Sequence, residues 1–236
     1  MIRFRSLGFF TLCLLIACTS AGPSKSGSST EGSSGDLTFE YTSIAEIGFI
    51  DQALSIGNRS PSTLAPTLRL EALDRDGEVL KDVTVTTVFG SDYGKVVIPP
   101  GGTIDILRFS PTSRIKDVAD VAVSVTDVRE VPPSGTQQVV MKPLSTSGEQ
   151  PDAFSNFASV EISNPNPQPA TVCVVLLIYD DPPPGRSQQA ETVLRVAGPV
   201  AVGGQSSSVT EVSTEFSQAT IDEAAIVSLK PYFCTG

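Results

Sequence analysis

The sequence predicts an all-β protein made of two tandem β-sandwiches, preceded by a signal peptide and a flexible tether. From residue 37 onward, short apolar blocks rich in Val, Ile and Thr are broken about every ten residues by Gly, Pro, Asn and Asp, a pattern typical of sandwiches. The second half repeats the order of turns and strands of the first half at an offset of 102 to 106 residues. The length of 236 residues suits two domains, each of about 100 residues.

The first 17 residues have the order of a bacterial signal peptide. Arg3 and Arg5 precede an uncharged apolar run at residues 7–17, which is too short to cross a hydrocarbon core of about 30 Å. Leu15-Ile16-Ala17-Cys18 resembles the lipobox of bacterial lipoproteins. We therefore expect cleavage before Cys18 and diacylglycerol on its thiol, with further acylation of its amino group giving a firm anchor. The alternative is an ordinary secretory signal with a chance cysteine beside it.

Residues 18–36 comprise the lipidated cysteine and a tether that is almost entirely Ser, Gly and Thr. Such a composition buries no apolar area, and the tether reaches about 20–25 Å as a flexible coil. After cleavage, 14 basic and 26 acidic side chains remain, a formal charge of −12. Anionic lipid head groups repel an acidic body, so the acyl chains have to hold it at the membrane. We expect a lipid-anchored protein of the bacterial envelope. If the cell is Gram-negative, the expected location is the outer membrane, because Thr19 rather than Asp follows Cys18.

The folded part divides into a first domain at residues 37–131, a Pro-containing linker at 132–137 and a second domain at 138–236. The strands predicted in the first domain are residues 44–56, 67–73, 79–89, 95–98, 103–109 and 121–131. Those predicted in the second domain are residues 138–144, 157–163, 171–179, 191–196, 207–212 and 225–232. Short helical turns are predicted at residues 117–119 and 220–224.

The repeated motifs resemble one family of bacterial extracytoplasmic domains. In the second half, Leu176-Leu177-Ile178-Tyr179-Asp180 is similar to the motif of the FxLYD domains, with Leu in place of Phe. In the first half, Leu70-Glu71-Ala72-Leu73-Asp74 lacks the aromatic residue, but an Asp-Gly turn and Pro100-Gly101-Gly102 follow it. The resemblance covers about half of each domain. It implies immunoglobulin-like sandwiches exported to the envelope, and it implies no catalytic residues.

Two cysteines remain in the mature second domain. Cys13 lies in the signal peptide and Cys18 carries lipid, which leaves Cys173 and Cys234. An even pair in an oxidising compartment favours a disulfide, although two separate buried thiols fit the same spacing. Two thiols without any histidine are too few soft ligands for zinc, so we predict no metal site.

One predicted strand is apolar at every position. A sandwich strand with one face in water should alternate, whereas Val172–Ile178 does not. Either this chain's own residues cover the outer face, or another domain or a partner does. If the core takes Val172, Val174, Leu176 and Ile178, then Val175 and Leu177 face outward as a candidate interaction surface; the reverse assignment stays open.

Composition excludes several functional classes. The acidic balance argues against nucleic acid as a partner, because phosphates require a basic face. Without histidine there is no Ser-His-Asp triad and no Cys-His pair. We predict a non-enzymatic envelope lipoprotein without a cofactor, acting as an interaction or scaffolding module with an envelope protein as its partner.

Two other functions remain open. One is a small-ligand or calcium-binding accessory lipoprotein, since Asp74 and Asp76 precede Gly77, although an Asp-Gly hairpin turn explains this spacing more simply. The other is a hydrolase that uses carboxylates alone.

Overall fold

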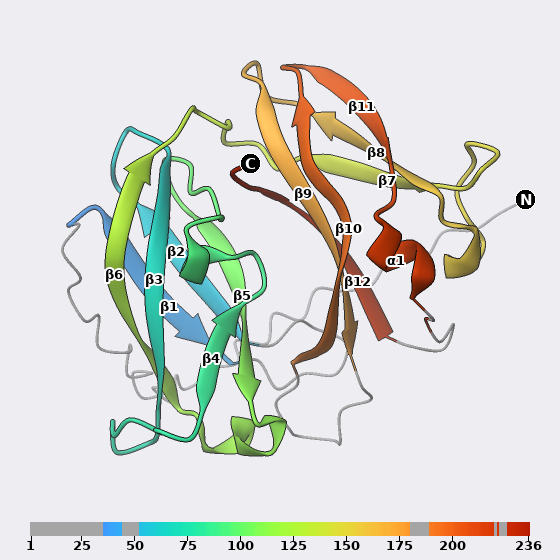
Figure 1. Cartoon of the computed structure of the whole chain (residues 1–236). Helices are drawn as coiled ribbons and strands as arrows, with labels where there is room; N and C mark the ends of the chain where they lie inside the picture. The colour runs from blue at the N-terminus through green and yellow to red at the C-terminus, as the bar shows by residue number, and fades with distance from the viewer. Residues whose placement is uncertain (1–34, 44–51, 180–188, 220, 222–225) are drawn as a thin grey trace, which may run out of the picture.

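The computed structural model describes residues 35–43, 52–179, 189–219, 221 and 226–236. Antiparallel strands dominate this part of the chain (Figure 1), which confirms the predicted all-β fold. Most of the strand predicted at 44–56 and all but residue 221 of the turn predicted at 220–224 lie outside the described residues.

The first sandwich is built from residues 37–130. One sheet has the order β1 (Leu37–Thr42), β2 (Ala53–Asn58), β5 (Thr103–Ser110) and β4 (Thr84–Thr87). The facing sheet pairs β3 (Leu64–Leu73) with β6 (Asp120–Glu130). Two short 3₁₀ helices, η1 (Ser91–Tyr93) and η2 (Thr112–Asp117), lie in the connections on either side of β5. The largest fully buried side chains between the sheets include Leu54, Leu107 and Phe109.

The second sandwich is built from residues 140–233. Its sheets have the orders β11 (Ser206–Glu211), β8 (Ser159–Asn164), β7 (Val140–Leu144) and β10 (Ala190–Val202), β9 (Ala170–Tyr179), β12 (Ile226–Phe233). Short helical segments are η3 (Phe154–Asn156) and α1 (Thr214–Gln218). The Ser213 hydroxyl caps α1 by accepting the N–H of Phe216 at 3.1 Å.

A buried asparagine at the end of β2 organises the turn that leads into β3. The Nδ2 group of Asn58 donates to the carbonyl oxygens of Ser62 and Ile98 at 2.9 and 3.0 Å. Its Oδ1 atom accepts the N–H of Ser60 at 2.9 Å. One side chain thus satisfies three backbone groups that the turn would otherwise leave unpaired.

Asn164 repeats this arrangement at the end of β8. Its Nδ2 group donates to the carbonyl oxygens of Gln168 and Gly203 at 2.8 and 3.1 Å, and its Oδ1 accepts the N–H of Asn166 at 3.0 Å. The positions and the direction of each hydrogen bond match those around Asn58. The repeat seen in the sequence therefore reflects one turn design used twice.

The two sandwiches differ in the sheet that their fourth strand joins. In the first sandwich β4 pairs with β5, whereas in the second β10 pairs with β9. The switch places β9 between two neighbours in its sheet. It also gives β10 a length of 13 residues, longer than the predicted 191–196.

Several predicted boundaries are corrected. The prediction omits β1, although Leu37, Phe39 and Tyr41 alternate along it. Residues 95–98 form isolated bridges rather than a strand. The helical turn predicted at 117–119 lies instead at residues 112–117, and α1 precedes the segment where the second turn was predicted.

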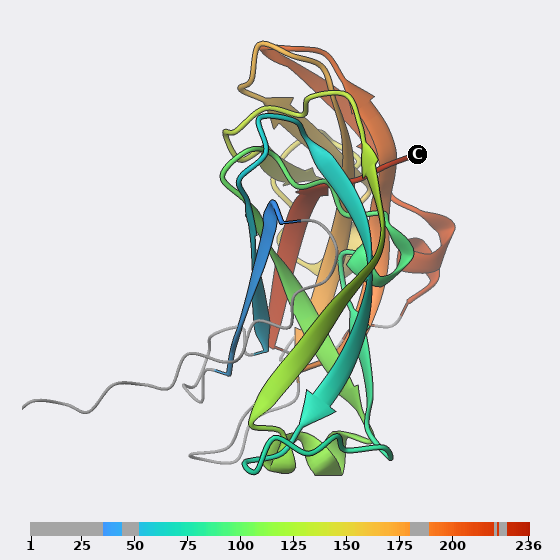
Figure 2. The same ribbon diagram turned by 90° about the vertical axis from the view of Figure 1, so that its left-hand side faces the viewer.

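The sandwiches stand side by side in Figure 1, and in Figure 2, seen from the first sandwich, they overlap. This arrangement explains the contrast between β3 and β9, which hold the same place in the two repeats. On β3 the polar residues Thr67, Arg69 and Glu71 alternate with buried ones, as expected for one wet face. On β9 the outer face is covered, so it is apolar as well.

Candidate functional site

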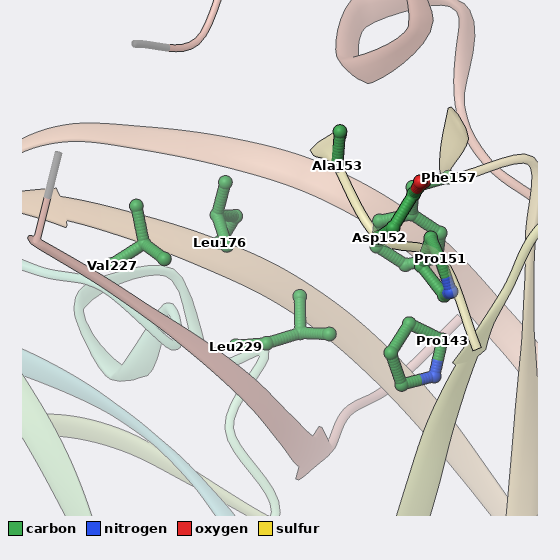
Figure 3. A pocket seen from close by; sticks show the side chains of 8 residues that line it. All are labelled: Pro143, Pro151, Asp152, Ala153, Phe157, Leu176, Val227 and Leu229. Carbon is green, nitrogen blue, oxygen red and sulfur yellow. The ribbon is translucent and has the colours of Figure 1, made fainter. Parts of the chain in front are cut away.

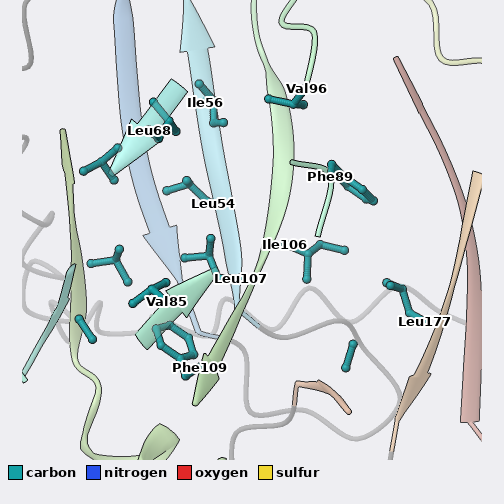
Figure 4. Close-up of a cluster of buried hydrophobic side chains, with 14 of the residues drawn as sticks. Leu54, Ile56, Leu68, Val85, Phe89, Val96, Ile106, Leu107, Phe109 and Leu177 are labelled. Atoms are coloured by element: carbon teal, nitrogen blue, oxygen red, sulfur yellow. The ribbon is translucent and has the colours of Figure 1, made fainter. Parts of the chain in front are cut away.

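The predicted interaction residues Val175 and Leu177 lie at the junction of the two sandwiches. They are 5% and 0% exposed and belong to the same buried cluster as Phe89 and Ile106 of the first sandwich, with Leu177 turned toward these two side chains in Figure 4. The opposite face of β9 enters the core of the second sandwich through Val172, Val174 and Leu176. The outward direction was thus correct, but the surface is covered by this chain itself. It is not exposed to another protein.

Polar side chains complete the junction. Gln189 is 4% exposed, and its amide accepts the N–H of Phe109 at 2.7 Å and donates to the Phe109 carbonyl oxygen at 2.9 Å. It pairs with the backbone of β5 as a neighbouring strand would. Arg108 donates in the other direction, from Nε to the carbonyl oxygen of Ala190 at 2.9 Å and from Nη2 to that of Glu191 at 2.5 Å. These bonds set the relative position of the two sandwiches.

The end of β12 also crosses to the first sandwich. The N–H of Val97 donates to the carbonyl oxygen of Phe233 at 3.2 Å, and the N–H of Thr235 donates to that of Lys95 at 3.0 Å. Val96 and Cys234 form an antiparallel bridge between them. Residues 95–97 therefore pair, through one antiparallel bridge, with the outer edge at the end of β12, at residues 233–235.

A buried carboxylate shapes the loop that leads to this contact. Asp105 is 0% exposed and accepts the N–H groups of Phe89 and Ile106 at 2.9 and 2.7 Å and the Ser91 hydroxyl at 2.7 Å. Burial raises the pKa of the Asp105 carboxyl, and these hydrogen bonds oppose the rise. The loop presents the Phe89 ring to Tyr232, with ring centroids 4.7 Å apart. Desolvation at this junction also raises the pKa of the Tyr232 hydroxyl.

Cys173 and Cys234 form the predicted disulfide, across 61 residues of sequence and with Cα atoms 5.9 Å apart. Cys173 shares the outer face of β9 with Val175 and Leu177 and lies opposite Tyr232 of β12. The bridge therefore joins β9 to the segment that pairs with residues 95–97. It links the end of the chain, which contacts the first sandwich, to β9, the central strand of the sheet β10-β9-β12.

An apolar cavity of about 230 Å³ opens at one side of the second sandwich, between β12 and β7 (Figure 3). Val227 and Leu229 line it from β12, and Leu176 lines it from β9. The opposite wall comes from β7 and the loop before β8, through Pro143, Pro151, Asp152, Ala153 and Phe157. Among the described residues that line it, Asp152 at the rim is the one charged group, and the hydrogen bond from Asn156 lowers its pKa. The lining suits aliphatic side chains.

The other residues considered as candidate ligands take structural positions. Asp74 closes the predicted hairpin turn, because its Oδ1 atom accepts the N–H groups of Asp76 and Glu78 at 2.9 and 3.0 Å. In the described part of the chain, no group of three or more Cys, Asp or Glu side chains is arranged to hold a metal ion. Nor does any helix there have the length and hydropathy of a membrane-spanning helix. Cys18, the predicted lipidation site, lies outside the described residues.

Sequence reasoning missed the cavity and the polar junction. Gln189 and Arg108 carry no local signal, because their partners are backbone groups about 80 residues away in sequence. The cavity depends on the distance between the two sheets of the second sandwich, and the alternation of apolar and polar residues along a strand does not predict that distance. Pro231 could have indicated that β12 is an edge strand, because proline within a sheet is found mainly at edges.

Comparison of the chain with models of known protein families finds no match. Comparison with curated protein sequences finds no match either.

Proposed function

We propose that this chain is a lipid-anchored protein of the bacterial cell envelope that acts as a non-enzymatic binding and scaffolding module. The observation that carries the proposal is Cys18, placed directly after Leu15-Ile16-Ala17 and an apolar run too short to span a bilayer. A residue in this position supports thioether lipidation, which anchors without a membrane-spanning helix.

The build of the folded part supports the scaffolding role. The cluster around Leu177, the amide of Gln189 and the backbone pairing of residues 95–97 with residues 233–235 join the two sandwiches at three kinds of contact. A body held in this way presents its surfaces in a defined arrangement. On a tether that reaches about 20–25 Å, it stays close to the membrane, where a high local concentration lets weak contacts suffice.

The use of the buried ionisable groups supports a role without catalysis. Asp105, the buried carboxylate with a raised pKa, accepts hydrogen bonds from Phe89, Ser91 and Ile106. It lies between the sheet and a structural loop rather than in the apolar cavity. A raised pKa at a carboxylate with these partners follows from burial in a structural position.

The anchor is tested by replacing one sulfur atom. Cys18→Ser removes the acylated thiol, so we expect the protein to move from the membrane fraction into the soluble fraction and its N-terminal peptide to lose the acyl mass. Cys13→Ser is the matched control, because Cys13 lies in the part that cleavage removes. A Cys18→Ser protein that remains on membranes, with a mature N-terminus at another residue, would show that the anchor is assigned wrongly.

The binding role is tested in intact cells by crosslinking and mass spectrometry of the crosslinked peptides. We expect a reproducible envelope protein joined to residues of the two sandwiches in the anchored protein. The yield should fall in the Cys18→Ser variant, because the local concentration at the membrane is lost. Crosslinks confined to the tether, or a yield that does not depend on Cys18, would count against a scaffold that works at the membrane.

A further inference from the structure

Only the end of the outer edge of β12 is hydrogen-bonded to other described residues. β12 is the last strand of its sheet, and it pairs with β9 in one unbroken register from Ile226–Tyr179 to Phe233–Val172. The N–H of Cys234 donates toward β9, to the carbonyl oxygen of Thr171 at 3.1 Å. In an antiparallel ladder, successive residues direct their backbone groups to opposite edges. The even-numbered residues of β12 therefore face β9, and the odd-numbered residues face outward.

The end of this outer edge is already paired with residues 95–97. The outward carbonyl of Phe233 accepts from Val97, and residues 95–97 run antiparallel to β12. Before Phe233, no strand among the described residues pairs with the outward groups of Val227, Leu229 and Pro231. Pro231 suits this place because its missing N–H would have pointed outward. Within the described residues, this part of the edge leaves the N–H groups of Val227 and Leu229 and three carbonyl oxygens without a strand partner.

The apolar cavity opens beside the same residues. Val227 and Leu229 carry the outward backbone groups, and their side chains line the cavity (Figure 3). In the first sandwich the corresponding side is closed, because β1 packs along β6. In the second, the space between β7 and β12 is the cavity itself. An added strand would find hydrogen-bonding groups along its backbone and room for its inward side chains.

We propose that the outer edge of β12, at residues 227–231, binds an extended segment of a partner protein by β-strand addition. The partner segment runs antiparallel to β12, in line with residues 95–97. Its apolar side chains, at alternate positions, enter the cavity lined by Val227, Leu229 and Phe157. This assignment rests on the proposed binding function and names its site.

The charge of the protein selects the occupant. A body with a formal charge of −12 after cleavage repels a second copy of itself. The same charge favours a segment with basic residues at its ends. The continuous line with residues 95–97 favours a backbone that pairs as a strand over a compact ligand in the cavity. The occupant is therefore an extended, basic-flanked apolar segment.

The test uses the anchored protein in detergent micelles and a synthetic heptapeptide that alternates valine with threonine between terminal lysines. We expect the peptide to slow amide hydrogen exchange at Val227 and Leu229 and to leave Ser228 and Lys230, which face β9, unchanged. A control peptide with N-methylated valines lacks the donors and should bind more weakly. Binding of both peptides alike, or protection elsewhere, would contradict strand addition.

Two substitutions change the edge in opposite directions. Val227→Pro removes an outward N–H and should weaken peptide binding about two- to tenfold, whereas Pro231→Ala supplies one and should strengthen it by a similar factor. Thermal unfolding checks that each variant folds. If Val227→Pro does not fold, the gain at Pro231→Ala still decides the question, and an unchanged affinity there refutes the site.

The remaining outcomes are also decisive. Protection of Val227 and Leu229 without peptide, increasing with protein concentration, would make a second copy the occupant and overturn the assignment. Peptide binding does not depend on lipidation. Its failure would therefore leave the result for Cys18 standing, and a failure of the anchor would leave the peptide result standing.

Discussion

At the scale of single residues, buried polar side chains form hydrogen bonds with backbone groups that no neighbouring strand or turn would otherwise pair. Gln189 pairs with the N–H and the carbonyl oxygen of Phe109 as a neighbouring residue of a sheet would. Asp105 holds the loop around Phe89 and Ser91 by accepting the N–H groups of both residues and the Ser91 hydroxyl. Each side chain is almost fully buried, so its polar atoms require these partners.

Asp105 makes stability depend on pH in a predictable direction. Burial raises the pKa of its carboxyl above the ordinary 3.8, so its contribution to stability is complete below pH 3.8 and is lost as the pH rises through the folded-state value. We expect the free energy of unfolding of the native protein, relative to Asp105→Asn, to increase as the pH falls from neutral. Urea unfolding at several pH values measures this difference, which also cancels the opposing effect of exposed carboxylates.

Asp105→Ala provides the contrast for this prediction. It removes the acceptor from the N–H groups of Phe89, Ser91 and Ile106, and we expect a loss of about 2–4 kcal/mol that is larger at acidic than at neutral pH, because only the native protein carries the titrating carboxyl. Parallel pH curves for the native protein and Asp105→Asn would show that the pKa of Asp105 is not raised.

At the scale of elements, the two repeats use the same turn with different sequences around it. Asn58 and Asn164 each donate to two carbonyl oxygens and accept one backbone N–H, although Ser60 stands in one turn and Asn166 in the other. The strands on either side differ more, because their outer faces meet different surroundings. The two turns therefore share the hydrogen bonds of one asparagine side chain rather than the sequence around it.

The shared turn predicts matched effects in the two sandwiches. Asn58→Asp and Asn164→Asp keep the accepting oxygen but replace two N–H donors with an oxygen facing carbonyl oxygens. We expect each change to lower the free energy of unfolding by about 2–4 kcal/mol. Chemical unfolding of both variants measures it. A large loss in one and none in the other would show that the two turns do not carry equal weight.

At the scale of the whole molecule, the outer face of β9 joins the two sandwiches. Val175 and Leu177 lie in the buried cluster of the first sandwich, between the polar contacts of Gln189 and the disulfide. The apolar contact removes these two side chains from water, and the hydrogen bonds set the orientation of the two sandwiches. The cavity and the outer edge of β12 lie on the second sandwich.

Leu177→Ala tests whether this contact holds the body together. Removing a fully buried leucine side chain should cost about 2–5 kcal/mol, and small-angle scattering should detect a looser arrangement of the sandwiches. Val209→Ala on β11 is the control, since Val209 is 60% exposed and its truncation should change stability by less than about 0.5 kcal/mol. Similar effects of the two changes would indicate that the junction contributes little.

The sequence by itself determined the strand content and the tandem repeat, and it favoured, without deciding, a disulfide between Cys173 and Cys234. These features depend on local alternation, on turn residues and on cysteine parity, all of which can be read along the chain. It also located the covered strand, since Val172–Ile178 departs from the alternation that Thr67, Arg69 and Glu71 keep in the first repeat. The omission of β1 shows the limit of this reading, because the neighbouring run at residues 44–56 is more apolar and was predicted as the first strand.

Only the tertiary structure decided what covers Val175 and Leu177. An apolar position reports that a side chain leaves water, but it does not report which surface receives it. Here the receiving residues, Phe89 and Ile106, lie about 70–90 residues earlier in the chain. The choice of sheet for β4 and β10, the backbone contacts of Gln189 and the cavity beside β12 are likewise set by how the elements meet in space. Such contacts depend on the packing of distant surfaces, which no local pattern encodes.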